Sequence, residues 1–192
     1  MANRYLSLFL TCIAIALGLS ACGVGNVINE MKIKTSPESQ AVEETSECDF
    51  NEYRIARTLA YINRVRSEDR TCGNELYHAA PSVSWDGQLY SAAQVHSEDM
   101  SIYDEIGHEV ARNSTSKSRI DDSGYNWSSF SENVAGGLNS PELAIDKWVA
   151  SPGHCINIMN PSHTQIGMAC AINNASSYRT YWTLLLATPE KR

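Results

Sequence analysis

The sequence predicts an α+β domain, because helical patterns precede two strand patterns near the C-terminus. Apolar residues recur at helical spacing over residues 52–69 and again over residues 86–103. Residues 164–172 and 179–187 read as strands, and the polar stretch 173–177 between them predicts a hairpin turn. A chain that combines several helices with a hairpin of neighbouring strands is typical of an α+β domain.

Composition limits the classes of function. The 192 residues are enough for one domain of ordinary size together with a targeting segment and a tail. The formal net charge is -7 and no basic cluster occurs, so we expect no nucleic-acid partner. The same charge gives no electrostatic reason to bind an anionic membrane.

The N-terminus reads as an export signal. Arg4 precedes an uncharged apolar run over residues 6–19, which is too short for a comfortable transmembrane span and is typical of a signal peptide over residues 1–21. The small residues before Cys22 resemble a bacterial lipobox, in which the cysteine is acylated, for example with palmitate, and becomes the new N-terminus. The alternative is ordinary cleavage near Ala21. A free exposed thiol is a liability in an oxidising compartment, which favours the lipobox.

The residues after the signal predict a tether and one domain. Residues 22–47 are polar and have no apolar period, so we expect a flexible tether ahead of a single domain over residues 48–192. Residue 23 is Gly rather than Asp. By the sorting rule for enteric bacterial lipoproteins, this implies an outer-membrane anchor, with the domain in the periplasm or on the cell surface.

Four cysteines remain in the exported domain. Export places Cys48, Cys72, Cys155 and Cys170 in an oxidising compartment, where they allow three pairings. No two of them have the short spacing of a zinc finger, which argues against a metal site made of these four.

Two helices are predicted in the first half of the domain. Asn51 is a plausible cap for the helix over residues 52–69, and residues 70–81 are expected to form a loop. Asp86 stands near the start of the second helix. His96 falls within the apolar stripe of that helix, which favours a core histidine over a ligand.

The second half of the chain predicts a short helix, a strand and a longer helix. Residues 112–116 read as a loop and residues 117–122 as a short helix that contains Arg119. Val134 between small residues suits a central strand, in which Glu132 and Asn133 point to opposite faces. Ser140-Pro141 predicts a helix that ends near Ala150.

His154 lies between two breaks in the chain. Ser151-Pro152-Gly153 predicts a turn, and Asn160-Pro161 predicts a second break. We therefore expect His154 on a short loop that is fixed at both ends. Such loops commonly carry functional sites, although a histidine here could also only cap the turn.

Two motifs carry a resemblance to a known family. Trp148-x-x-Ser-Pro-Gly-His-x-x-Asn-Ile-Met-Asn-Pro161 resembles the signature of the bacterial SCP-like branch of the CAP superfamily, which includes cysteine-rich secretory proteins, insect venom antigen 5 and plant pathogenesis-related proteins. Ser131-Glu-Asn-Val-Ala135 resembles the family's Gly-Glu-Asn-(Ile/Val)-Ala, with Ser in place of Gly. Shorter matches are Asn63-x-x-Arg66, Val83-Ser-Trp-Asp86, Gly124-Tyr125 and Tyr181-Trp-Thr183.

The resemblance covers residues 52–187 and implies a fold and a disulfide pattern. The fold is the CAP-type three-layer α-β-α sandwich with a small, mostly antiparallel sheet. Bacterial relatives combine a Cys-Gly in the loop before the second helix with the Gly-His-Cys motif, which implies the pair Cys72–Cys155. The pair Cys48–Cys170 then remains.

The resemblance also implies a site. In the family, two His and two Glu face each other across a cleft, and in some members they hold a divalent metal. Carried over, His108, Glu132 and His154 form the expected metal site, for Zn(II) or another divalent ion with an open fourth position. The second Glu position is Ser151, which puts full coordination in doubt. His96, Asn133 and Ser151 are expected to line the cleft.

Three functions remain open. The first is a binding module of the cell envelope that recognises a lipid, peptide, cell-wall or protein ligand through the His/Glu cleft. The second is a metal-assisted hydrolase or protease, against which stands the missing nucleophile, since Ser131 lacks a Gly-x-Ser-x-Gly context. The third is a structural or adhesion module with a vestigial cleft, or a buried hydrogen-bond cluster in place of a site. The missing second Glu favours a protein that is not an enzyme.

Overall fold

The computed structural model describes residues 48–111 and 114–191. They belong to one unit of the chain, Val42–Arg192. The predicted signal peptide, the predicted lipidation site Cys22 and the whole of the predicted tether fall on residues 1–47, outside the described residues. Within the described ranges, every helix is too short or too polar to span a membrane.

A four-stranded sheet forms the middle of the domain. Its strands are β3 (Ser84–Trp85), β4 (Trp127–Gly136), β5 (Gln165–Ile172) and β6 (Thr180–Pro189), in the spatial order β3-β5-β6-β4. Strand β3 pairs with β5 in parallel, whereas β5 with β6 and β6 with β4 are antiparallel. The sheet is therefore small and mostly antiparallel, as predicted.

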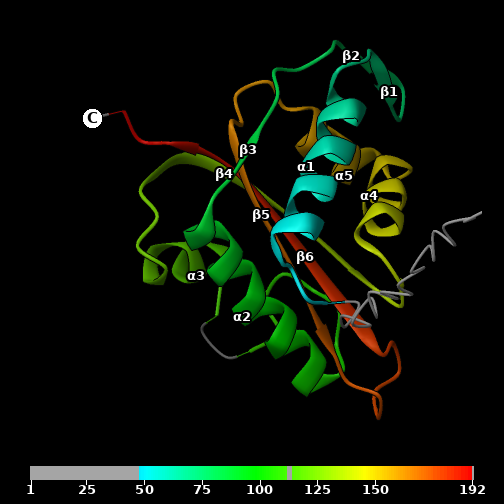
Figure 1. Cartoon of the computed structure of the whole chain (residues 1–192), viewed down its shortest axis with the longest axis vertical. Coiled ribbons are helices and arrows are strands. Elements are labelled where there is room, and N and C mark those ends of the chain that lie inside the picture. The colour runs from blue at the N-terminus through cyan, green and yellow to red at the C-terminus, as the bar shows by residue number, and fades with distance from the viewer. Residues whose placement is uncertain (1–47, 112–113, 192) are drawn as a thin grey trace, which may run out of the picture. The chain divides into compact units, whose positions relative to one another are not determined.

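Helices cover both faces of this sheet (Figure 1). One face carries α2 (Gly87–Tyr103) and α3 (Ser116–Asp122), and the other carries α1 (Glu52–Arg66), α4 (Pro141–Val149) and α5 (Pro152–Met159). Side chains alternate along the strands to fill both interfaces. Met168 and Leu184 pack toward the α1–α4–α5 layer, whereas Ala169 and Leu185 pack against α2 and α3. The predicted three-layer α+β sandwich is confirmed.

The helix starts follow the predicted caps. The side chain of Asn51 accepts a hydrogen bond from the Arg54 amide, and that of Ser140 accepts one from the Leu143 amide. The carboxylate of Asp86 accepts from two amides at the start of α2. Each cap satisfies amides that have no partner within their own helix, so these residues fix where the helices begin.

Four local predictions were wrong. Helix α1 ends at Arg66, and the expected loop over residues 70–81 contains the hairpin of β1 (Arg70–Cys72) and β2 (Glu75–Tyr77), whose turn uses the positive φ of Gly73. Strand β4 lies at an edge of the sheet rather than in its centre. His154 lies in the first turn of helix α5 rather than on a loop, because Pro152 at the first helical position starts a helix there.

Both expected disulfides are present. Cys48–Cys170 joins the segment before α1 to β5, with a Cα–Cα distance of 4.9 Å. Cys72–Cys155 joins β1 to α5, with a Cα–Cα distance of 5.5 Å. The second bridge holds the first turn of the helix that carries His154, and it therefore helps to position that residue.

A buried arginine anchors the other end of α5. Arg66 is fully buried, and its guanidinium donates to the carbonyl oxygens of Ile158, Asn160 and His163 as well as to that of Pro81. Burial lowers its pKa to about 10. A cation among the last carbonyls of a helix is favourable, so Arg66 stabilises the end of α5 that lies opposite His154.

Candidate functional site

Glu132 lies at the centre of the candidate site. It stands on β4, and only 3% of its side chain is exposed. Its Oε2 accepts a hydrogen bond from Arg119 Nη2 on α3 at 2.7 Å. Its Oε1 accepts from the hydroxyl of Ser116 at 2.7 Å and lies 2.8 Å from Nδ1 of His108. Donors from three residues therefore occupy both oxygens of this carboxylate.

The environment keeps Glu132 ionised. Burial raises the pKa of its carboxyl, but the hydrogen bond from His108 and the charge of Arg119 outweigh burial and leave the pKa below its usual value. Arg119 is itself buried, and its Nη2 also contacts the carbonyl oxygen of His108. The pair is thus a buried, hydrogen-bonded ion pair.

His108 is the exposed partner of Glu132. About half of its side chain is exposed, at 53%. The hydrogen bond to Glu132 raises the pKa of His108 above its usual value, although partial burial opposes this. Because Glu132 is an acceptor, Nδ1 of His108 carries the proton. Its Nε2 makes no hydrogen bond to any residue that the structure describes, and it remains available to a ligand.

His96 is the buried neighbour of this pair. Its Nε2 lies 2.7 Å from the carbonyl oxygen of Gly107 and 3.8 Å from Oε1 of Glu132. Burial lowers its pKa, so the ring is neutral and donates from Nε2 to Gly107. Its Nδ1 has no partner among residues 48–111 and 114–191. His96 thus packs in the core behind Glu132, as the sequence favoured.

His154 and Asn133 lie on the other side of β4. The side-chain amide of Asn133 donates to the carbonyl oxygen of His154 at 3.1 Å, and its Oδ1 accepts from Asn157 at 2.8 Å. Burial lowers the pKa of His154, and the charge of His108 lowers it further. Asn133 therefore fixes the backbone that carries His154, and the prediction that Glu132 and Asn133 point to opposite faces is confirmed.

Ser151 does not join the group around Glu132. It is the residue before α5, and its side chain makes no cap hydrogen bond. The structure thus brings together His96, His108 and Glu132, with His154 nearby and Asn133 behind it.

Comparison with known proteins decides the family. The profile of the cysteine-rich secretory protein (CAP) family matches residues 50–186 of this chain. The chain belongs to this family. The matched range contains nearly all of the sandwich and every residue of the candidate site.

Relatives of the CAP domain occur in bacteria. The chain is 30% identical to Bacillus subtilis YkwD over 83 residues, which are 43% of this chain and 32% of that protein. It is 25% identical to the Bacillus subtilis membrane protein YlbC over 91 residues, which are 47% of this chain and 26% of that protein. The chain therefore spans only about a third or less of the length of these relatives.

Solved structures share the CAP fold. An extracellular Bacillus anthracis protein with an SCP domain superposes with a TM-score of 0.56 at 22% identity, over 71% of this chain and 40% of that one. An outer surface protein from Borrelia burgdorferi superposes with a TM-score of 0.58 at 14% identity, over 76% of this chain and 99% of that one. At these identities the likeness shows the fold.

The donors around Glu132 do not fit a metal ion. Within the described ranges, no three His, Cys, Asp or Glu side chains are grouped so that they could hold one. Arg119 occupies Oε2 of Glu132 at 2.7 Å, and its fixed positive charge would repel a cation there. Ser151 supplies no carboxylate at the second Glu position. We therefore derive no step that passes through the expected zinc ion.

Sequence reasoning missed the residues that hold the carboxylate. Arg119 was predicted only as part of a short helix, and no contact of Ser116 with Glu132 was predicted. Arg119 precedes Glu132 by 13 positions, a separation that indicates no contact by itself. Only the placement of α3 beside β4 brings the two side chains together.

A second polar cluster lies on the α5 side of β4. Ser131 Oγ lies 3.0 Å from Nε2 of the buried His163, which also accepts from the side-chain amide of Asn160 at 3.2 Å. The orientation of that amide is fixed, because its Oδ1 accepts from the Ser162 amide. Nε2 of His163 is thus unprotonated, and the hydroxyl of Ser131 donates to it.

Proposed function

We propose that this chain is an exported protein of the cell envelope, anchored by a lipid on Cys22, whose CAP domain binds a carboxylate-bearing ligand at the surface around His108 and His154. Support for export comes from the signal-like N-terminus and from the extracellular and outer-surface relatives. The lipobox resemblance at Cys22 supports the anchor, and Gly23 supports the outer membrane as its place.

The hydrogen bonds made by the Glu132 carboxylate favour a binding function over a catalytic one. Both oxygens of Glu132 are engaged by protein donors, so the carboxylate is not free to act as a general base or as a metal ligand. What remains open to a ligand is Nε2 of His108, on a ring that is half exposed and has a raised pKa. Once the ring is protonated, Nε2 becomes a hydrogen-bond donor for a ligand.

Charge selects the class of ligand. Arg119 and Glu132 neutralise each other, so protonation of His108 leaves the group with one net positive charge. An imidazolium that donates from Nε2 forms its strongest hydrogen bond with an anionic oxygen. A carboxylate meets that requirement, and it occurs at peptide C-termini, on fatty acids and on cell-wall components.

The test uses a carboxylate and its neutral amide. N-acetylglycine is titrated into the protein near pH 6, while the His108 and His154 ring signals are followed by NMR, beside N-acetylglycinamide as the neutral probe. We expect saturable shifts with the acid, about tenfold weaker binding of the amide, and loss of binding in His108→Ala. The matched control His78→Ala changes a largely exposed histidine that follows β2 and is expected to leave binding intact. Equal binding of acid and amide, or binding that survives His108→Ala, would overturn the proposal.

The anchor is tested separately. Cells that express the full chain are labelled with a palmitate analogue, and the label and the membrane fraction are compared between Cys22→Ser and Cys12→Ser. We expect Cys22→Ser to abolish both the label and membrane retention, because the first thiol after the signal is the acceptor. The control Cys12→Ser lies within the apolar run of the signal and is expected to retain both. Labelling that persists in Cys22→Ser would contradict the proposed lipid anchor on this residue.

A hydrolase is the second candidate, favoured only by the contact between Ser131 and His163. A serine that donates to an unprotonated histidine has the geometry of a nucleophile with its base. The check is labelling with a fluorophosphonate, which phosphonylates activated serines. Label on the parent that is lost in both Ser131→Ala and His163→Gln, but kept in Ser129→Ala, would support this reading. An unlabelled protein would exclude it.

A further inference from the structure

Three large apolar side chains are exposed at one end of the domain. Ile102 and Tyr103 lie in the last turn of α2 and are 72% and 57% exposed. Tyr178 lies in the turn between β5 and β6 and is 44% exposed. Figure 1 shows this turn beside the end of α2, with the β1–β2 hairpin at the opposite end of the domain. We call Ile102, Tyr103 and Tyr178 the tip surface.

Protein contacts hold the two parts of the tip surface together. The carboxylate of Asp104, the residue after Tyr103, accepts hydrogen bonds from the amide and the hydroxyl of Ser177 at 2.9 and 2.8 Å. The ring of Tyr178 packs edge-on against the buried ring of Tyr181, with 5.9 Å between their centroids. The tip surface is therefore formed before anything binds to it, so that binding costs little ordering.

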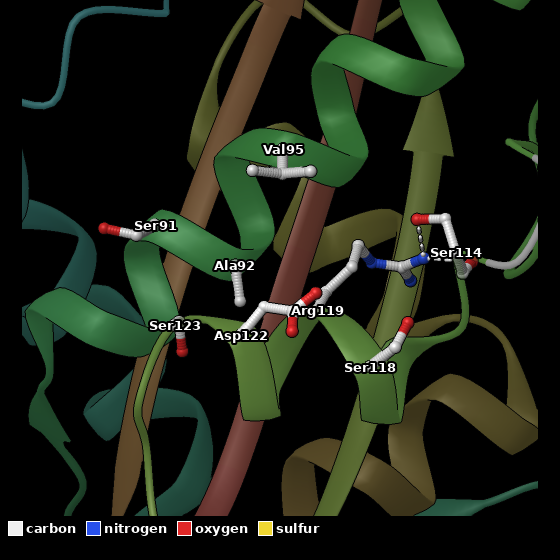
Figure 2. A pocket seen from close by; sticks show the side chains of 8 residues that line it. All are labelled: Ser91, Ala92, Val95, Ser114, Ser118, Arg119, Asp122 and Ser123. Carbon is white, nitrogen blue, oxygen red and sulfur yellow. Dashed lines mark hydrogen bonds between the residues drawn. The ribbon is translucent and has the colours of Figure 1, made fainter.

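The tip surface is small and ends where α2 meets α3. Further back along α2, Val95 lines a pocket of about 330 Å³ between these helices (Figure 2). Most other side chains of that pocket are polar: Ser91, Ser114, Ser118, Arg119, Asp122 and Ser123. The tip side chains expose roughly 300–400 Å² in all, since a whole aromatic side chain presents about 150–250 Å². A stable protein interface buries about 800 Å² on each partner, so the tip surface alone is too small for a second protein.

The N-terminal segment joins the domain close to the tip surface. Cys48, the first described residue, is bonded to Cys170 on β5. Cys170 lies about 10 Å along the strand from the turn that carries Tyr178. Residues 23–47 separate Cys48 from Cys22, and a chain of this length reaches at most about 90 Å. A lipid on Cys22 therefore keeps the tip end of the domain within reach of the bilayer.

The side chains of the tip surface match the interface of a bilayer. Tyrosine combines an apolar ring with a polar hydroxyl, and it is enriched where lipid headgroups meet acyl chains. Ile102 adds an aliphatic group that gains free energy on leaving water. The exposed residues Glu98, Asp104 and Glu105 flank the surface, and anionic lipids would repel their carboxylates. The surface therefore favours zwitterionic headgroups.

We infer that the tip surface docks on the zwitterionic bilayer to which the chain is anchored. Docking rests on the proposed lipid on Cys22. Three side chains alone bind a bilayer weakly, whereas attachment converts docking into an intramolecular step. Docking brings Ile102 and the two tyrosine rings to the level of the headgroups. It also fixes the orientation of the domain, with the β1–β2 hairpin directed away from the membrane.

The test uses phosphatidylcholine vesicles whose acyl chains carry bromine near the headgroup, because bromine quenches tryptophan fluorescence on contact. The lipidated full chain is reconstituted as Tyr103→Trp, Tyr178→Trp and the matched control Leu76→Trp, whose parent side chain on β2 is 56% exposed. Relative to the parent protein and to vesicles without bromine, both tip variants are expected to lose most of the added emission, whereas Leu76→Trp keeps it. Equal quenching of all three variants would overturn the inference. So would unquenched tip variants in protein that stays with the vesicles, although the anchor would then stand.

A charge on the tip surface tests docking separately from the anchor. Ile102→Glu, added to Tyr103→Trp, is expected to abolish quenching without unfolding the domain, because the Ile102 side chain is 72% exposed. Leu76→Glu in the same background is the matched control and should leave quenching unchanged. Both proteins should stay with the vesicles, since retention depends on Cys22. Quenching that survives Ile102→Glu would contradict docking, whereas a parent protein that leaves the vesicles would contradict the anchor and docking together.

Two further measurements test the assigned partner. Anionic phosphatidylglycerol, added to the vesicles, is expected to reduce the quenching of Tyr103→Trp, and an increase would contradict the preference for zwitterionic lipid. Without lipid, the emission of Tyr103→Trp should not depend on protein concentration. A shift to the blue as the concentration rises would assign the tip surface to a second copy of the chain and overturn the inference.

Discussion

Arg119 and Glu132 form an ion pair in which each side chain is only 3% exposed and Nη2 lies 2.7 Å from Oε2. Removal of one partner leaves the other as an uncompensated buried charge. We expect Arg119→Met to lower the free energy of unfolding by about 3 kcal/mol, as measured by urea denaturation. Glu132→Gln is expected to lower it less, because the amide retains the shape and one acceptor.

A surface ion pair is the control for this prediction. Arg57 contacts Glu142 at 3.1 Å, but 58% of the Arg57 side chain is exposed. Solvent screens such a pair, so Arg57→Met is expected to change the midpoint of denaturation little. If the Arg119 and Arg57 variants are equally stable, the buried pair does not hold α3 against β4.

The pKa values of His108 and His154 are expected to be shifted in opposite directions from the usual value for histidine. The hydrogen bond to Glu132 raises the pKa of His108, whereas burial and the charge of His108 lower that of His154. An NMR titration of the ring protons should place the pKa of His108 above that of His154. Glu132→Gln should lower the pKa of His108, because it removes the negative charge. A His108 that titrates below His154 in the parent would contradict the described geometry.

The low pKa of His163 is expected to make the stability of the fold depend on pH. Burial, aided by the charge of Arg66, lowers its pKa to about 4 from the usual value of 6.5. Below pH 6.5 the unfolded chain binds a proton that the folded chain does not bind, so this histidine destabilises the fold as the pH falls toward 4. The full effect is about 3 kcal/mol. Urea denaturation from pH 7 to pH 4 should show a flatter profile for His163→Gln than for the parent, whereas His78→Gln should follow the parent.

Gly167 on β5 sets how closely helix α2 approaches the sheet. A Cβ at this position would lie 2.1 Å from the backbone nitrogen of Tyr90 and 2.2 Å from the carbonyl carbon of Leu89. Backbone cannot yield as a flexible side chain does, so Gly167→Ala is expected to cost about 3 kcal/mol or more. Gly87→Ala is the matched control, since a Cβ there meets nothing within 4 Å. Thermal unfolding that gives equal Tm values for the two variants would contradict this close approach.

Local signals were sufficient for most of the fold. The cap at Asp86, the Ser140-Pro141 start and the turn before β6 are short-range features, and the structure has all three. The hairpin after α1 was missed because its strands have only three residues each and depend on pairing with each other. The edge position of β4 was missed because buried residues on an edge strand produce the same sequence pattern as those on a central one.

The candidate site was also predicted only in part. Motifs with family spacing identified His108, Glu132 and His154, and the described structure places all three near the edge strand β4 or on α5 beside it. The partners of Glu132 have no local signature, because Arg119 reaches it from a different element. That single contact changes the chemistry, since it converts an expected metal ligand into one half of an ion pair.

The most direct test of the proposed site is titration calorimetry of the protein with Zn(II), beside His108→Ala and His154→Ala. Because Glu132 is committed to Arg119, we expect the surface to bind anionic oxygens without a metal. The predicted result is therefore no saturable zinc binding at this site, with the same trace for the parent and both variants. One saturable zinc site that is lost in both variants would contradict this and would restore the metal centre that the sequence motifs imply.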